Sequence, residues 1–116
     1  MTKKLIMILG LVLSSMLMKA QAFFVPFPKA GDKYWQKQVP VAMRNDYIRL
    51  GNLYQKKTWN AIPAETFAEF RTNGNRTRYE EASFGIRKQF VCLVMAEIMQ
   101  GRGRFLPSIR KGLHYF

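Results

Sequence analysis

Residues 84–100 (FGIRKQFVCLVMAEIMQ) limit the possible folds of this chain more than any other segment. Apolar residues recur there at the three- and four-residue spacing of one helical face, and others fill most of the remaining circumference. A helix that is apolar on nearly every side must be buried on several sides. We expect this helix to follow an N-cap at Ser83 and to end at Gly101-Arg102-Gly103.

Glu97 lies inside this apolar ring, at about the same helical angle as Ile86 and Phe90. A buried carboxylate must be paired or protonated, because isolated charge is costly away from water. We expect a structural ion pair between Glu97 and a nearby arginine, either Arg76 or Arg71. In the alternative interpretation, Arg76 pairs with Glu80 instead.

The rest of the chain predicts further short helices. Pro40 suits the first turn of a helix over 40–56, Pro63 opens one that Gly74 ends, and a last helix begins near residue 106. The helix expected over 40–56 has one apolar face, which is formed by Met43, Tyr47, Leu50 and Tyr54. No alternation long enough for a sheet and no internal repeat occurs, so the sequence predicts an all-α fold.

The first 22 residues predict a cleavable signal peptide. Lys3 and Lys4 form a positive start, residues 5–18 are uncharged, and Ala20-Gln21-Ala22 supplies a small-x-small cleavage pattern. These 14 uncharged residues are shorter than the roughly 20 that a membrane-spanning helix needs, which disfavours the alternative of an uncleaved anchor. We expect cleavage after Ala22, and a periplasmic or secreted product without a stable membrane anchor.

The product beginning at Phe23 is small and strongly basic. Residues 1–22 contain three of the 19 Lys and Arg and no acid, which leaves 16 basic against 7 acidic residues, a net charge of +9. Such an excess favours polyanions, and in an exported protein we expect an acidic polysaccharide or a lipid surface rather than nucleic acid. The alternative is a solvated basic surface without a partner. Residues 23–39 are expected to be an extended lead-in with a short turn capped by Asp32, followed by one helical region over 40–116.

The sequence offers little for catalysis. The single cysteine, Cys92, lies in the apolar helix and is expected to be a buried thiol without a disulfide. The only histidine, His114, lies two residues from Phe116, a poor position from which to hold a base in place. No metal-ligand spacing, phosphate-binding glycine loop or nucleophile elbow occurs, so we predict no catalytic residue, metal or cofactor.

An ordered set of residues over about 34–113 resembles the N-terminal helical region of bacterial heparinase II/III-like polysaccharide lyases. The set is Tyr34-Trp35, Arg44, Asp46 to Arg49, Ile62-Pro63, Glu69 to Thr72, Gly74-Asn75-Arg76, Tyr79-Glu80, Ala96-Glu97 and Gly103 to Leu106. The resemblance implies the first helices of an incomplete α/α toroid, in a family that cleaves acidic glycans by β-elimination. It also implies a truncated chain, or one that a second polypeptide completes, inactive alone because the family's catalytic groups come later. The chain departs from the family at Pro107-Ser108 and Lys111, where members tend to have an acidic pair and an Asn.

Four residues are candidates for binding a glycan: Arg71, Asn75, Arg76 and Arg104. Arg76 has the planar fork that suits a uronate carboxylate. The structural alternative is that Gly74 ends one helix, Asn75 starts the next, and Arg76 pairs with a glutamate. Trp35 and Trp59 can stack on sugar rings, but aromatic residues beside helix breaks more often fill a core. A small secreted binder of acidic polysaccharides without catalysis is the alternative to the lyase hypothesis.

Overall fold

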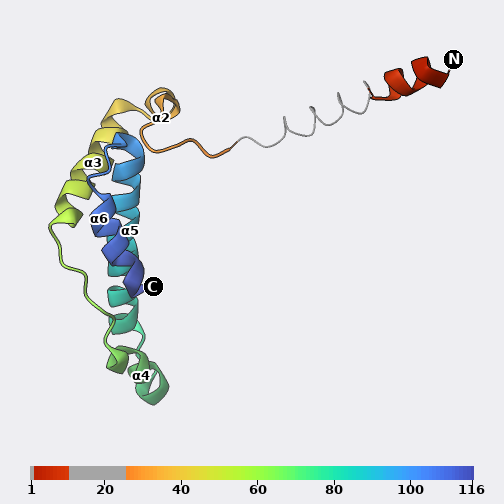
Figure 1. Ribbon diagram of the computed structural model, residues 1–116. Helices are drawn as coiled ribbons and strands as arrows, with labels where there is room; N and C mark the ends of the chain where they lie inside the picture. The colour runs from red at the N-terminus through yellow and green to blue at the C-terminus, as the bar shows by residue number, and fades with distance from the viewer. Residues whose placement is uncertain (1, 11–25) are drawn as a thin grey trace.

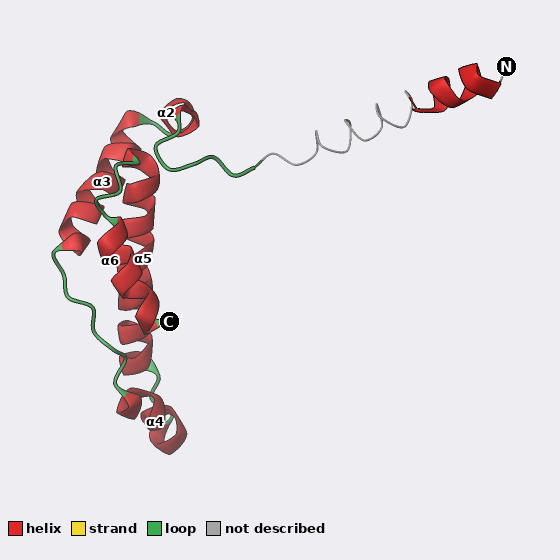
Figure 2. Cartoon of the chain, in the orientation of Figure 1, coloured by secondary structure: helices red, strands yellow, loops and turns green. Residues whose placement is uncertain are grey.

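The computed structural model describes residues 2–10 and 26–116 of the chain. Residues 2–10, which include the positive start of the predicted signal peptide, are helical and exposed. The rest of that prediction, including the cleavage site after Ala22, lies outside the described residues. Every regular element in the two described ranges is helical and none is a strand, as Figure 2 shows. The predicted all-α class is therefore confirmed for this part of the chain.

The helices are arranged around one long member. They are α2 (Lys33–Gln38), α3 (Val41–Gln55), α4 (Ala64–Asn73), α5 (Thr77–Gln100) and α6 (Leu106–Gly112), and a 3-10 turn, η1 (Leu113–Tyr115), follows. Helices α3 and α6 lie along the C-terminal half of α5, whereas α4 lies beyond its N-terminal end (Figure 1). Most of the packing on α5 is thus in its C-terminal half, and Ser83 and Ile86 are the buried residues of its N-terminal half.

Prolines and glycines set most of the helix boundaries. Pro40 and Pro63 occupy the N-cap positions of α3 and α4. Gly74 and Gly101 end α4 and α5 in the left-handed conformation, with φ of 75° and 66°, which glycine adopts without steric cost. The side chain of Asp32 accepts a hydrogen bond from the backbone N–H of Tyr34 at 2.7 Å and so caps α2, as expected.

The predicted start of the long helix is wrong. Ser83 is not an N-cap but an interior residue of α5, which begins six residues earlier at Thr77, and its side chain is buried. The residues between Thr77 and Ser83 contain no Pro or Gly, so the helix continues through them. The N-cap position is occupied by Arg76, which makes no side-chain capping bond, and Oδ1 of the preceding Asn75 accepts from the backbone N–H of Thr77 at 3.1 Å.

The core lies where α3, α5 and the chain after α5 meet. Leu93, Ala96 and Phe105 have no exposed surface, and Tyr54, Trp59 and Ile109 pack around them. Gly51 allows this close contact, because a Cβ built on it would lie 2.3 Å from Cβ of Ala96. The apolar face predicted for α3, which begins with Met43, is only partly correct. Met43 is exposed, and α3 contacts α5 through Gly51.

Candidate functional site

The four candidate glycan-binding residues do not form one site. Arg71 is on α4, and Asn75 and Arg76 are in the connection from α4 to α5. Arg104 follows the opposite end of α5, a helix of 24 residues. At 1.5 Å per residue, the two ends of this helix are about 36 Å apart, so no single sugar unit can contact all four residues.

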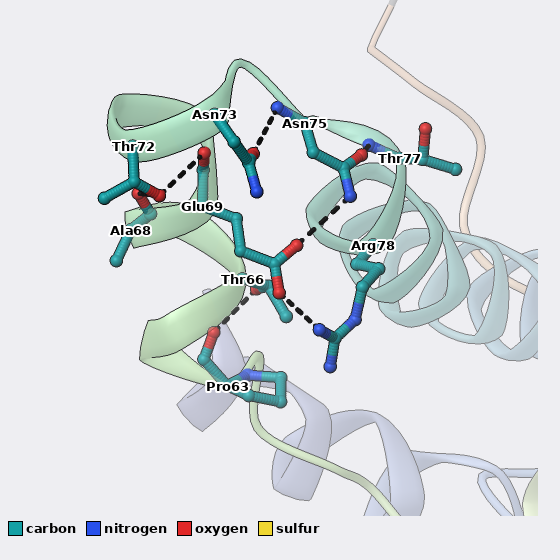
Figure 3. A network of polar contacts seen from close by, with 9 residues as sticks. All are labelled: Pro63, Thr66, Ala68, Glu69, Thr72, Asn73, Asn75, Thr77 and Arg78. Atoms are coloured by element: carbon teal, nitrogen blue, oxygen red, sulfur yellow. Dashed lines mark hydrogen bonds and ion pairs between the residues drawn. The ribbon is translucent and has the colours of Figure 1, made fainter.

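At the α4–α5 junction, the side chain of Asn75 is held by local hydrogen bonds (Figure 3). Its Oδ1 accepts from Thr77, its Nδ2 donates to Glu69 Oε2 at 3.2 Å, and its backbone N–H donates to the side chain of Asn73 at 2.9 Å. The other carboxylate oxygen of Glu69 pairs with Arg78. Asn75 therefore joins two helices, which is the structural role that the sequence analysis weighed against sugar binding.

Arg76 pairs with Glu80, not with Glu97. The guanidinium Nη2 lies 3.1 Å from Glu80 Oε1, one helical turn along, in an exposed ion pair. Arg71 is exposed in the last turn of α4. Both arginines lie at the far end of α5 from Glu97, so the predicted Glu97–Arg76 pair is wrong.

Glu97 is buried as predicted, but backbone N–H groups satisfy it. Its Oε1 accepts from the N–H of Gly103 at 2.5 Å and its Oε2 accepts from the N–H of Phe105 at 3.2 Å. Gly101 and Gly103, both with positive φ, turn the chain so that these donors face back toward the helix. The carboxylate thereby fixes the corner between α5 and α6, which is the role of a structural residue.

Arg104 belongs to the same corner. Its Nε donates to Gln100 Oε1 at 2.5 Å, its guanidinium lies 4.3 Å from the centroid of the Phe105 ring, and its carbonyl accepts from Gln55 Nε2 at 2.7 Å. These contacts connect the end of α3 to the start of α6, so Arg104 has a structural role.

Trp59 is a core residue. Its indole N–H donates to the carbonyl of Ser108 at 3.0 Å, and its ring stacks on Tyr115 with centroids 6.0 Å apart and planes 22° apart. A Cβ on Gly112 would lie 2.4 Å from this indole, so the ring packs directly on α6. Trp35 is half-buried and donates to the carbonyl of Lys29 at 2.9 Å. Both tryptophans thus make intramolecular contacts of the kind that a structural role requires.

A basic groove that the sequence analysis missed opens between the end of α3 and α6. It is an open hollow of about 860 Å³, and its lining includes Lys56, Lys57, Lys111 and His114 but no acidic residue. Gln55, Trp59, Ser108 and Tyr115 also line it. The sequence signal was the Lys56-Lys57 pair after a helix, but only the tertiary fold brings Lys111 next to it.

The described residues contain no group of three or more potential metal ligands, and His114 is exposed on η1. Burial raises the pKa of the Cys92 thiol, and the charge of Lys88 only partly offsets this, so the thiol stays protonated at neutral pH. No helix in the described part of the chain is long and apolar enough to cross a membrane. Comparison of the sequence with protein-family models and with curated proteins found no match.

Proposed function

We propose that this chain is the N-terminal helical part of a heparinase II/III-like polysaccharide lyase, the first helices of an α/α toroid, inactive alone. The ordered residue set over 34–113 supports this proposal. The observation that carries it is that large apolar side chains on α4 and α5 lie open to solvent. Such surface is expected where a helical layer packs against a further body.

Four apolar side chains on α4 and α5 are each about half exposed or more: Phe67, Phe70, Phe84 and Val91. Phe84 and Val91 are seven residues apart and so share one face of α5. Covering a phenylalanine fully is worth about 1.5–3 kcal/mol, so a neighbouring helix layer would stabilise this face considerably.

The proposed role is structural because β-elimination needs groups that this region does not bring together. A donor must neutralise the uronate carboxylate, a base must remove the α-proton, and an acid must protonate the leaving oxygen. The one histidine, His114, lies beside lysines and aromatic residues in the basic groove, with no carboxylate lining it. We therefore assign the chemistry to later parts of the enzyme.

A chimera tests this proposal. Residues 23–116 replace the matching segment of an active heparinase II/III-like lyase, and activity is followed by the ultraviolet absorbance of the unsaturated product. We expect a soluble, active chimera, and no cleavage by residues 23–116 alone. The double variant Phe84→Asp/Val91→Asp should abolish solubility of the chimera, whereas Lys33→Asp/Lys37→Asp, on exposed positions of α2, should not. An insoluble wild-type chimera, or cleavage by the isolated chain, would contradict the proposal.

The second candidate is a small secreted binder of acidic polysaccharides without catalysis. The basic groove favours it, together with the net charge of +9 that remains beyond residue 22. It requires residues 23–116 to be a soluble monomer that melts cooperatively, whereas the lyase proposal predicts aggregation or non-cooperative melting of this isolated piece. Gel filtration and thermal circular dichroism of residues 23–116 therefore separate the two functions.

A further inference from the structure

We infer that the basic groove binds the carboxylate or sulfate group of an acidic sugar through Lys56, Lys57 and Lys111. None of these lysines is among the four candidates that the sequence suggested. The choice of a sugar as the carrier of the anion rests on the proposed function, whereas the anion site itself rests on the groove.

The groove has walls from two elements that are hydrogen-bonded to each other. Lys56 and Lys57 directly follow α3, and Lys111 is in the last turn of α6. The bond from Trp59 Nε1 to the carbonyl of Ser108 (3.0 Å) and the bond from Gln55 Nε2 to that of Arg104 (2.7 Å) join these walls. The lysines are thus held on either side of one hollow before any ligand arrives.

A third element fixes the backbone beneath the lysines. Gln89, buried on α5, donates from Nε2 to the carbonyl of Lys57 at 3.2 Å. The ammonium of Lys57 lies 4.9 Å from the centroid of the Tyr54 ring, which lines a neighbouring hollow and not this groove. The backbone of Lys57 is therefore fixed before any ligand binds, which lowers the entropic cost of binding.

The charges in the groove are not neutralised within the described part of the chain. Its three ion pairs use Asp46, Glu69 and Glu80, each with an arginine, and none involves a lysine. No acidic residue of the described part of the chain lines the groove, although Lys56 and Lys57 also border a neighbouring hollow lined by Glu81. An anion about 4 Å from one ammonium gains about 1 kcal/mol in water and more near a protein surface, so three lysines around one hollow favour an anion there.

The lining of the groove suits a sugar acid. It is an open hollow, with the polar side chains of Gln55 and Ser108 beside the lysines. A sugar acid presents hydroxyl groups and an anion together, and this lining matches both.

The test compares two triple variants of the mature chain, residues 23–116, fused to a soluble carrier protein to limit aggregation. Lys56→Gln/Lys57→Gln/Lys111→Gln removes the groove charges, and Lys29→Gln/Lys33→Gln/Lys37→Gln removes three exposed charges around α2. Both lower the net charge equally. Binding of heparin and of hyaluronan is titrated by fluorescence of Trp59 in a Trp35→Phe background. We expect the groove variant to bind at least about tenfold more weakly, and the α2 variant to change less than about threefold.

Each outcome bears on the inference. Equal losses of affinity in the two variants would show binding by overall charge. No binding by a wild-type fusion whose α3, α5 and α6 amides are protected from hydrogen exchange would remove the site. Either result overturns the inference. Preference for heparin over hyaluronan identifies sulfate as the bound group, and equal binding identifies the carboxylate. Equally strong, groove-dependent binding of single-stranded DNA would overturn the assignment to sugars. An inactive chimera with intact groove binding would overturn the proposed function alone.

Discussion

The two halves of α5 differ sharply in burial although they belong to one uninterrupted helix. In the C-terminal half, Leu93 and Ala96 have no exposed surface, because α3 and α6 pack on them. In the N-terminal half, Phe84 is 59% exposed, and α4 makes only sparse contact with the helix. The N-terminal half is buried on one side only, at Ser83 and Ile86, and its Phe84 side is open to solvent.

The cause of the difference lies in small residues and in the chain reversal after α5. Gly51 lets α3 approach Ala96 closely, and the turn at Gly101 and Gly103 inserts Phe105 into the gap. The N-terminal half has no such reversal, and polar contacts from Glu69 and Asn75 connect it to α4. A few hydrogen bonds between exposed or half-buried groups are worth less than the apolar burial around Phe105, so we expect the two halves to respond differently to equivalent substitutions.

The largest expected difference comes from removing one phenylalanine ring in each half. Phe105→Ala should destabilise the chain by about 3–5 kcal/mol, because it leaves a cavity in the core. Phe84→Ala should change stability by less than about 0.5 kcal/mol, because the ring is exposed. Amide hydrogen exchange over α3, α5 and α6 in the carrier fusion measures both. Similar losses of stability in Phe105→Ala and Phe84→Ala would mean that the two rings are buried to the same degree.

The next largest difference comes from adding one methyl group. Gly51→Ala should cost about 3 kcal/mol, because its Cβ would lie 2.3 Å from Cβ of Ala96 and 3.0 Å from the Phe105 ring. Gly85→Ala, where no atom lies within 4 Å of the added Cβ, should stabilise α5 by about 0.5–1 kcal/mol. Amide hydrogen exchange over α3 and α5 in the carrier fusion provides the comparison, and faster exchange in Gly85→Ala would show unexpected packing there.

Several features of this architecture could be predicted from residue types. The prolines before α3 and α4 and the glycines after α4 and α5 fix boundaries by local sterics, which sequence shows directly. The partner of Glu97 could not be predicted, because hydrophobic periodicity does not show which backbone N–H groups a distant turn will present. The basic groove escaped prediction for the same reason, since Lys56 and Lys111 become neighbours only through tertiary packing.

A smaller effect is expected from the buried carboxylate. Glu97→Gln should cost about 2 kcal/mol, because the amide NH₂ faces a backbone N–H that the carboxylate oxygen accepted. Glu80→Gln removes only an exposed ion pair with Arg76 and should cost less than about 1 kcal/mol. Exchange rates of the Gly103 and Phe105 amides measure the change, and unchanged protection in Glu97→Gln would exclude Glu97 from fixing the corner.

The smallest expected effect concerns the polar junction that joins α4 to α5. Asn75→Ala removes the cap on Thr77 N–H and the bond to Glu69, and should cost about 1 kcal/mol, limited to the first turn of α5. Asn60→Ala, in the exposed connection from α3 to α4, is the matched control and should have no effect. Exchange of the Thr77 to Tyr79 amides should accelerate while that of Leu93 and Ala96 stays unchanged. If the buried half also lost protection, the two halves of α5 would unfold as one unit, and the N-terminal half would not depend on a neighbouring body for its stability.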